Sequence, residues 1–193
     1  MNRNTAKGLS YLLSNPVVGG LGGLLVMLRE KAFFKNPILN ILAVLFFYSI
    51  VPFVSVYYLR LRGRTDVFMS ERSRRPKHFI PGLVGYAFSA VVFQAWGMGL
   101  MKTASASFLL TSLILLLLTL AVKVSIHVAG LTATVILILY AYWPAGLILL
   151  LLIPVLAWAR VNTGEHTCWQ TILGAFTGFA GSLLGILVFP PGS

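Results

Sequence analysis

Long uncharged runs, each about as long as a helix that crosses a bilayer, follow one another through almost the whole chain. Crossing about 30 Å of hydrocarbon takes about 20 helical residues. The runs are apolar on all sides, whereas the strands of a membrane barrel alternate apolar and polar residues. The sequence therefore predicts an all-α fold, a polytopic transmembrane helical bundle of six or seven spans. The predicted spans are approximately Leu9–Leu28, Pro37–Leu59, Phe79–Met101, Ala104–Val122, Val124–Tyr142, Ala145–Ala159 and Thr167–Val188.

Composition agrees with this prediction. Hydrophobic residues make up 58% of the chain and charged residues 10%, a mixture that excludes an ordinary soluble domain. The choice between six and seven spans depends on the first run, where Asn15-Pro16 and four glycines could divide it into an interfacial piece and a helix. We expect a single integral membrane domain over residues 1–193, located in the plasma (inner) membrane.

Three short polar segments separate the apolar runs: Arg72–Pro76, Ser125–His127 and Arg160–His166. If the spans alternate in direction, all three segments lie at the same membrane face. One span more or fewer between them would have placed them on opposite faces. The alternation therefore predicts one shared site, in which two histidines and an arginine meet.

The net charge of +11 is unevenly distributed over the predicted loops. Most of the 15 basic residues belong to the face with the polar segments, and only Arg29, Lys31, Lys35 and Lys102 belong to the other. The positive-inside rule then predicts a cytoplasmic site. Because the aromatic residues lie in the spans or at their ends, the charge indicates anionic lipid headgroups as partners and no nucleic acid.

Two of the polar segments resemble known motifs. Lys123-Val-Ser125-Ile-His127 and Ala159-Arg160-x5-His166-x3-Gln170 are similar to the second and third motifs of the type-2 phosphatidic acid phosphatase superfamily, Pro-Ser-Gly-His and Ser-Arg-x5-His-x3-Asp. The first motif, Lys-x6-Arg-Pro, is matched only at Arg75-Pro76. The resemblance implies a phosphatase-like core at about 66–193, with 1–65 as additional N-terminal helices.

The chain departs from these motifs at five positions, which are Phe68, Val124, Ile126, Ala159 and Gln170. Phe68 stands where the first motif has its lysine, a cation that Arg72, Arg74 or Lys123 could supply instead. Gln170 replaces an aspartate, and its amide oxygen can still accept a hydrogen bond from an imidazole N–H. Because a neutral amide stabilises an imidazolium less than a carboxylate does, we expect a working but slower site.

By resemblance, His166 is the nucleophile that forms a phosphohistidine, and His127 protonates the leaving lipid oxygen. Gln170 orients His166 from position i+4, one helical turn away. The phosphate-binding groups are predicted to be Arg160, Arg75 and Ser125, with Arg72 and Lys123 as further candidates, because phosphoryl transfer needs cations and hydrogen-bond donors around the phosphate oxygens. We expect no metal and no cofactor, since the acidic residues form no cluster.

These assignments predict a membrane enzyme that hydrolyses a lipid phosphate or diphosphate. Isoprenoid phosphates, phosphatidylglycerol phosphate and phosphatidic acid are all candidate substrates, and a phosphotransferase would differ only in its acceptor. The alternative is a non-catalytic protein that binds or transports a lipid phosphate, a role that Phe68 and Gln170 favour.

Two further expectations concern the last helix. Gly174-x3-Gly178 and Gly181-x3-Gly185 should let a neighbouring helix of the same chain approach closely, rather than form a dimer seam. The oligomeric state stays open. The chain's one cysteine, Cys168, is expected to be a buried small apolar residue.

Overall fold

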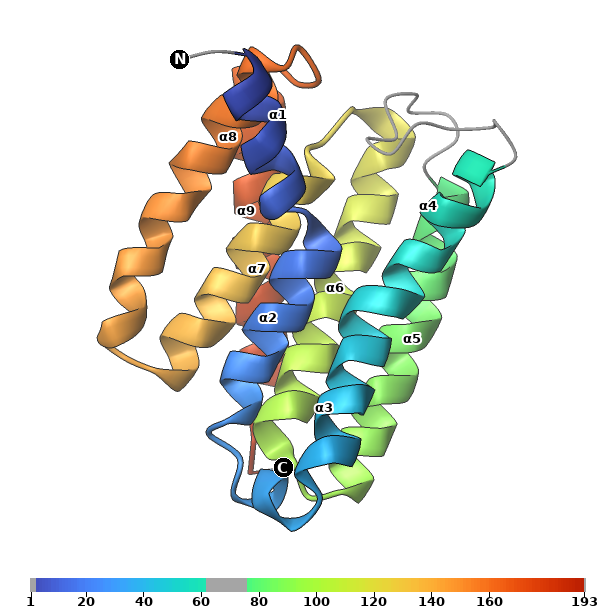
Figure 1. Ribbon diagram of the computed structural model, residues 1–193, viewed down its shortest axis with the longest axis vertical. Coiled ribbons are helices and arrows are strands. Elements are labelled where there is room, and N and C mark those ends of the chain that lie inside the picture. The colour runs from blue at the N-terminus through green and yellow to red at the C-terminus, as the bar shows by residue number, and fades with distance from the viewer. Residues whose placement is uncertain (1–2, 62–75, 193) are drawn as a thin grey trace.

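The computed structural model describes residues 3–61 and 76–192, and every regular element in this part of the chain is a helix (Figure 1). The all-α prediction is therefore confirmed for the described residues. In chain order the elements are α1 (Arg3–Leu12), α2 (Asn15–Met27), η1 (Lys31–Lys35), α3 (Pro37–Leu45), η2 (Phe46–Ile50), α4 (Val51–Leu61), α5 (Pro76–Ala95), α6 (Gly99–Ala121), α7 (Ile126–Ala141), η4 (Ala145–Leu151), α8 (Leu152–Asn162) and α9 (Cys168–Val188).

Four segments of the described chain are long and apolar enough to cross a membrane: Pro37–Val54, Gly99–Ala121, Ala145–Asn162 and Cys168–Val188. The bent pair of α1 and α2 would be a fifth, and α7 and Phe79–Ala95 are shorter apolar helices. These helices indicate membrane association. The higher count of six or seven spans is not confirmed.

The first predicted span is broken, as its Asn15-Pro16 sequence suggested. α1 ends at Leu12 and α2 begins at Asn15, with a bend of 46° between them. Pro16 lies in the first turn of α2, where its missing N–H breaks no helical hydrogen bond. α2 then packs against η2 and α7, while α1 turns aside and packs along α8 (Figure 1).

The boundary between the third and fourth predicted spans is wrong. The sequence placed it near Lys102, but α5 already ends at Ala95 and the chain turns at Gly97, which has a φ of 67° that favours glycine. α6 therefore begins at Gly99 and contains Lys102 as a buried residue. Its first turn is held by the Glu30 carboxylate, which accepts a hydrogen bond from the Met101 N–H at 3.0 Å.

α9 packs against both α6 and α7 through its glycines. Gly174 lies against Ser125, which precedes α7, and Gly178 against Ala129 of α7. Gly181 and Gly185 lie against Thr111 and Ser107 of α6. A side chain at any of these four positions would collide with the neighbouring backbone. The expectation of close packing within the chain is confirmed.

Two of the three polar segments meet at one end of the bundle. We define the site end as the α6–α7 junction (residues 122–125) and the α8–α9 loop (residues 163–167), and Figure 1 shows both connections at the same end of the long axis. The Ser125 N–H donates to the Gln170 carbonyl oxygen at 3.1 Å, which joins the starts of α7 and α9. In the remaining segment, residues 72–75 lie outside the described part of the chain.

Candidate functional site

The start of α9 is a capping box. The Thr167 hydroxyl accepts a hydrogen bond from the Gln170 N–H at 3.4 Å, and the Gln170 Oε1 accepts one from the Thr167 N–H at 3.3 Å. These bonds satisfy two of the donors that every helix leaves unpaired at its N-terminus. The Thr-x-x-Gln spacing is a known sequence signal for this motif, and the sequence analysis missed it.

The capping box also determines the tautomer of His166. Its Nδ1 lies 3.0 Å from the same Gln170 Oε1. Because the Thr167 N–H can only donate, the atom that it contacts must be the amide oxygen, and the ring nitrogen facing that oxygen must carry a proton. In the neutral imidazole, the lone pair is then on Nε2. The contact predicted from the i+4 spacing is present.

Arg160 lies in the last turns of α8 and has no exposed surface. Its carbonyl oxygen accepts hydrogen bonds from the His166 N–H at 3.3 Å and from the Thr163 hydroxyl at 3.1 Å. The loop between Arg160 and His166 is thus folded back on itself. One turn before Arg160, Leu156 packs against Val128 of α7, so this face of α8 is directed toward α7.

Ser125 is the residue that precedes α7 at its N-terminus, and it is completely buried. Its Oγ has no hydrogen-bond partner among the described residues. A buried hydroxyl without a partner is costly, so this atom retains its capacity to bind a ligand or water. Lys123 is half-buried on the junction just before it.

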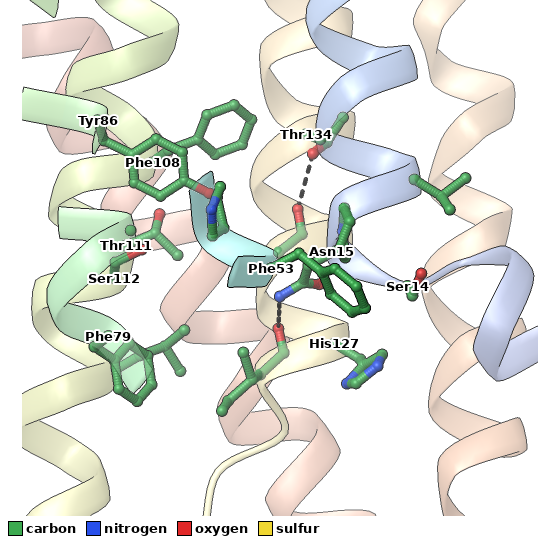
Figure 2. Close-up of a pocket in the computed structure, with 18 of the residues that line it drawn as sticks. Ser14, Asn15, Phe53, Phe79, Tyr86, Phe108, Thr111, Ser112, His127 and Thr134 are labelled. Atoms are coloured by element: carbon green, nitrogen blue, oxygen red, sulfur yellow. Dashed lines mark hydrogen bonds between the residues drawn. The ribbon is translucent and has the colours of Figure 1, made fainter. Parts of the chain in front are cut away.

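His127 lies on a different side of α7. Ser125 and Ala129 face α9, and at 3.6 residues per turn a residue midway between them points about 160° away from that interface. His127 accordingly lines a cavity of about 490 Å³ with Ser14 and Asn15 of the α1–α2 break (Figure 2). Asn15 is held there by a hydrogen bond from its Nδ2 to the Ile126 carbonyl oxygen at 3.1 Å.

The described contacts therefore join His166, Gln170, Arg160 and Ser125 at the site end, and place His127 where the first turn of α7 borders the cavity. Their chemical roles stay predictions. Arg72 and Arg75 lie outside the described residues. The cavity was not predicted from the sequence, because its walls come from six helices (α1, α2, α4, α5, α6 and α7) that are far apart along the chain.

The expectation that Cys168 is buried is wrong. It is exposed in the first turn of α9, beside Trp169, whose side chain is 68% exposed. This face of α9 is turned outward because the glycine face of the same helix is the one that packs against α6 and α7.

Comparison of the chain with protein-family models, with curated proteins and with solved structures found no match.

Proposed function

We propose that this protein is a membrane-embedded phosphatase that hydrolyses a lipid phosphate or diphosphate through His166. The observation that supports it best is the contact between His166 Nδ1 and Gln170 Oε1, in a loop where the His166 N–H donates to the carbonyl oxygen of the completely buried Arg160. A guanidinium and an oriented imidazole at one loop are the groups that phosphoryl transfer to histidine requires.

In the proposed reaction the Nε2 of His166 attacks phosphorus, and the bond from phosphorus to the lipid oxygen breaks. The proton on Nδ1 stays directed at Gln170, which stabilises the positive charge that develops on the ring. His127 gives a proton to the leaving lipid oxygen. A water molecule then gives a proton to His127 and attacks the phosphohistidine, the bond from phosphorus to Nε2 breaks, and inorganic phosphate and the free imidazole are released.

The negative charge of the transferring group would be stabilised from two helices. Arg160 offers a rigid, permanently charged guanidinium, and Ser125 offers its hydroxyl and the first N–H groups of α7. Lys123, two residues before Ser125, would add a second cation. Arg75 and Arg72 keep their predicted role as further phosphate ligands.

One observation favours the alternative of a non-catalytic lipid-phosphate binding or transport protein. The group facing His166 is an amide and not a carboxylate, so it stabilises an imidazolium less well. A transporter would move the substrate across the bilayer with its phosphate intact, whereas the phosphatase releases phosphate. A phosphotransferase would show the same phosphohistidine with another acceptor.

The deciding experiment is phosphate release by the purified protein in detergent, with and without vanadate. The panel contains an isoprenyl phosphate and its diphosphate, phosphatidylglycerol phosphate and phosphatidic acid. We expect His166→Ala and His127→Ala to lose turnover, and the third histidine of the chain, in His78→Ala, to be a matched control that keeps it. Turnover that survives His166→Ala would refute the nucleophile, and binding without turnover of any lipid would favour the alternative.

We further propose that the site end faces the cytoplasm of a cell whose plasma (inner) membrane holds the protein. The exposed Cys168 is the only cysteine, so a membrane-impermeant maleimide reports the side directly. Cys168 should react only after permeabilisation. A Cys168→Ser, Lys35→Cys double variant places the thiol at the other end and should react in intact cells. The reverse pattern would overturn this orientation.

A further inference from the structure

The cavity beside His127 lies where two helices diverge. α2 packs against η2, a short π-helical segment, whereas the chain beyond η2 continues as α4 and packs against α5. Pro52, in the first turn of α4, contributes to the cavity wall at this point of divergence. The break between α1 and α2 lies on the other side of the same space and contributes Ser14 and Asn15.

The walls of the cavity are mainly aromatic and aliphatic. Phe53 comes from α4, Phe79 and Tyr86 from α5, and Phe108 from α6. In Figure 2, Tyr86 and Phe108 lie at the level of Thr134, and His127 lies at the other end of the cavity. From His127 to Thr134 is seven residues of α7, or roughly 10 Å at about 1.5 Å per residue.

This cavity has the properties of a ligand site. Its volume of about 490 Å³ lies within the range of about 300–1,000 Å³ typical of ligand pockets. His127 lies at one end with Ser14 and Asn15 nearby, and Thr134 lies at the other end (Figure 2). The cavity also reaches the outside of the bundle, since Tyr11 and Val17 line it and are 51% and 37% exposed. In a bilayer this opening would face lipid.

We infer that the cavity holds the hydrocarbon chain of a phosphorylated lipid, which enters sideways between α2 and α4 and keeps its headgroup at the His127 end. The inference rests on the proposed function and adds a role for the N-terminal helices. α1, α2 and α4 lie outside the predicted phosphatase-like core, yet they supply one wall of the cavity. They would select the substrate by the shape of its chain.

The cavity should select lipid chains by their fit and not by added affinity. A hydrocarbon chain leaving the bilayer gains no hydrophobic free energy in an apolar cavity, because lipid tails are equally apolar. Affinity must then come from the phosphate, and the cavity can only accept or reject a chain by its fit. Filling the cavity should therefore penalise long chains and spare short ones.

Gly82 is a position at which a larger side chain would fill part of the cavity. This residue lines the cavity, and a Cβ added there meets only ordinary contacts, with the Tyr86 ring at 3.7 Å and the Pro52 side chain at 4.0 Å. Gly82→Leu should thus fold and occupy cavity space, with Gly82→Ala as a smaller step. Gly8→Leu is the matched control, because Gly8 lies exposed on α1 with nothing within 4 Å of an added Cβ.

The test is photocrosslinking in vesicles, which does not depend on turnover. The full-length His166→Ala variant is mixed with a phosphatidic acid or an isoprenyl phosphate that carries a diazirine near the end of its chain. We expect crosslinks to cavity-lining residues of α2, α4 and α5 with one or both probes. Gly82→Leu in the same background should reduce them about tenfold, and Gly8→Leu should not.

The outcomes separate the two proposals. Crosslinks confined to the outward faces of the helices, or crosslinks that Gly82→Leu leaves unchanged in a monodisperse protein, would overturn the cavity inference even if wild-type protein releases phosphate. Cavity crosslinks without phosphate release by the wild type would support the cavity inference and overturn the phosphatase. The probe that crosslinks identifies the chain class, acyl or isoprenoid.

Discussion

The two ends of the bundle both bury polar side chains, but in the described part of the chain they differ in how many of these groups lack a hydrogen-bond partner. At the end opposite the site, Glu30 accepts from the Met101 N–H, Asn40 donates to the Phe33 carbonyl oxygen, and Thr103 donates to the Phe189 carbonyl oxygen. In the half that contains the site end, several buried oxygen atoms have no hydrogen-bond partner among the described residues, namely those of Ser10, Asn15 (Oδ1), Thr119 and Ser125.

This contrast teaches which end is built for stability and which for binding. Buried polar groups in folded proteins are nearly always hydrogen-bonded, and exceptions require an explanation. At the opposite end the bonds connect η1 to α3, α2 to α6, and α6 to the end of α9, so they hold the bundle together. At the site end, the Ser125 hydroxyl without a partner among the described residues would be available to the phosphate of the proposed substrate.

The largest effect should come from the guanidinium at the site end. Arg160→Lys keeps the charge but loses the two-pronged geometry, and we expect turnover to fall about 100-fold. Arg29→Lys is the matched change at the other end, where the guanidinium lies 5.4 Å from the centre of the Tyr142 ring, and it should leave turnover unchanged. Initial rates at saturating lipid phosphate measure both. Equal effects of the two variants on turnover would contradict the proposed difference between the two ends of the bundle.

Ser125 and Thr103 should respond in opposite ways. Ser125→Ala removes a buried hydroxyl without a partner, so the fold should be as stable or more stable while turnover falls about tenfold. Thr103→Val removes a hydroxyl that donates to Phe189, so the free energy of unfolding should fall by about 1 kcal/mol with turnover preserved.

Thermal unfolding and phosphate release on the same preparations separate the two effects. A Ser125→Ala protein that is destabilised but fully active would show that this hydroxyl is structural.

A smaller effect, and an increase in turnover, should follow from placing a carboxylate at position 170. Gln170→Glu keeps both the capping box and the acceptor for His166, and its charge stabilises the imidazolium by about 1 kcal/mol more, or about fivefold in turnover. Gln170→Leu lacks the acceptor and should lose activity. Initial rates at saturating lipid phosphate check the gain. A slower Gln170→Glu enzyme would contradict this role.

The smallest expected effect is a pH-dependent change in stability that is caused by Glu30, at the end opposite the site. Burial raises the pKa of the Glu30 carboxyl above its ordinary value of 4.5, although hydrogen bonds from the Met101 and Leu100 N–H groups oppose the shift. A raised pKa means that the folded state binds the proton more tightly. Its stabilising contribution is therefore complete below the ordinary value and is lost as the pH rises through the folded-state pKa.

The difference in Tm between wild type and Glu30→Gln should accordingly decrease from about pH 4 to about pH 8. Glu165→Gln, on the loop at the site end, is the control for general charge effects. A Tm difference that does not change with pH would show that Glu30 titrates normally.

The features that were predicted correctly are those determined by residues close together in the chain. The apolar runs gave the helices, Asn15-Pro16 gave the break between α1 and α2, and the i+4 spacing gave the contact between His166 and Gln170. The glycines of α9 gave its close packing. In each case the cause lies within one or two helical turns of the residues concerned.

The features that were missed depend on contacts between distant segments. Lys102 looked like a loop residue, because nothing local shows that Glu30, 71 positions away from Met101, holds the start of α6. The cavity forms from the divergence of α2 and α4, and no single segment encodes it. His127 borders this cavity because the orientation of α7 between α9 and α2 decides which of its residues face each neighbour.

The most direct test of the central claim is to trap the covalent intermediate. Wild-type protein is mixed with a lipid phosphate labelled with radioactive phosphorus, quenched in base within the first turnovers, and digested for peptide mapping. We predict an acid-labile, base-stable label on the peptide that contains His166, abolished by His166→Ala and kept by His78→Ala. Release of labelled phosphate with no label on the protein, or with a label that survives His166→Ala, would contradict the account.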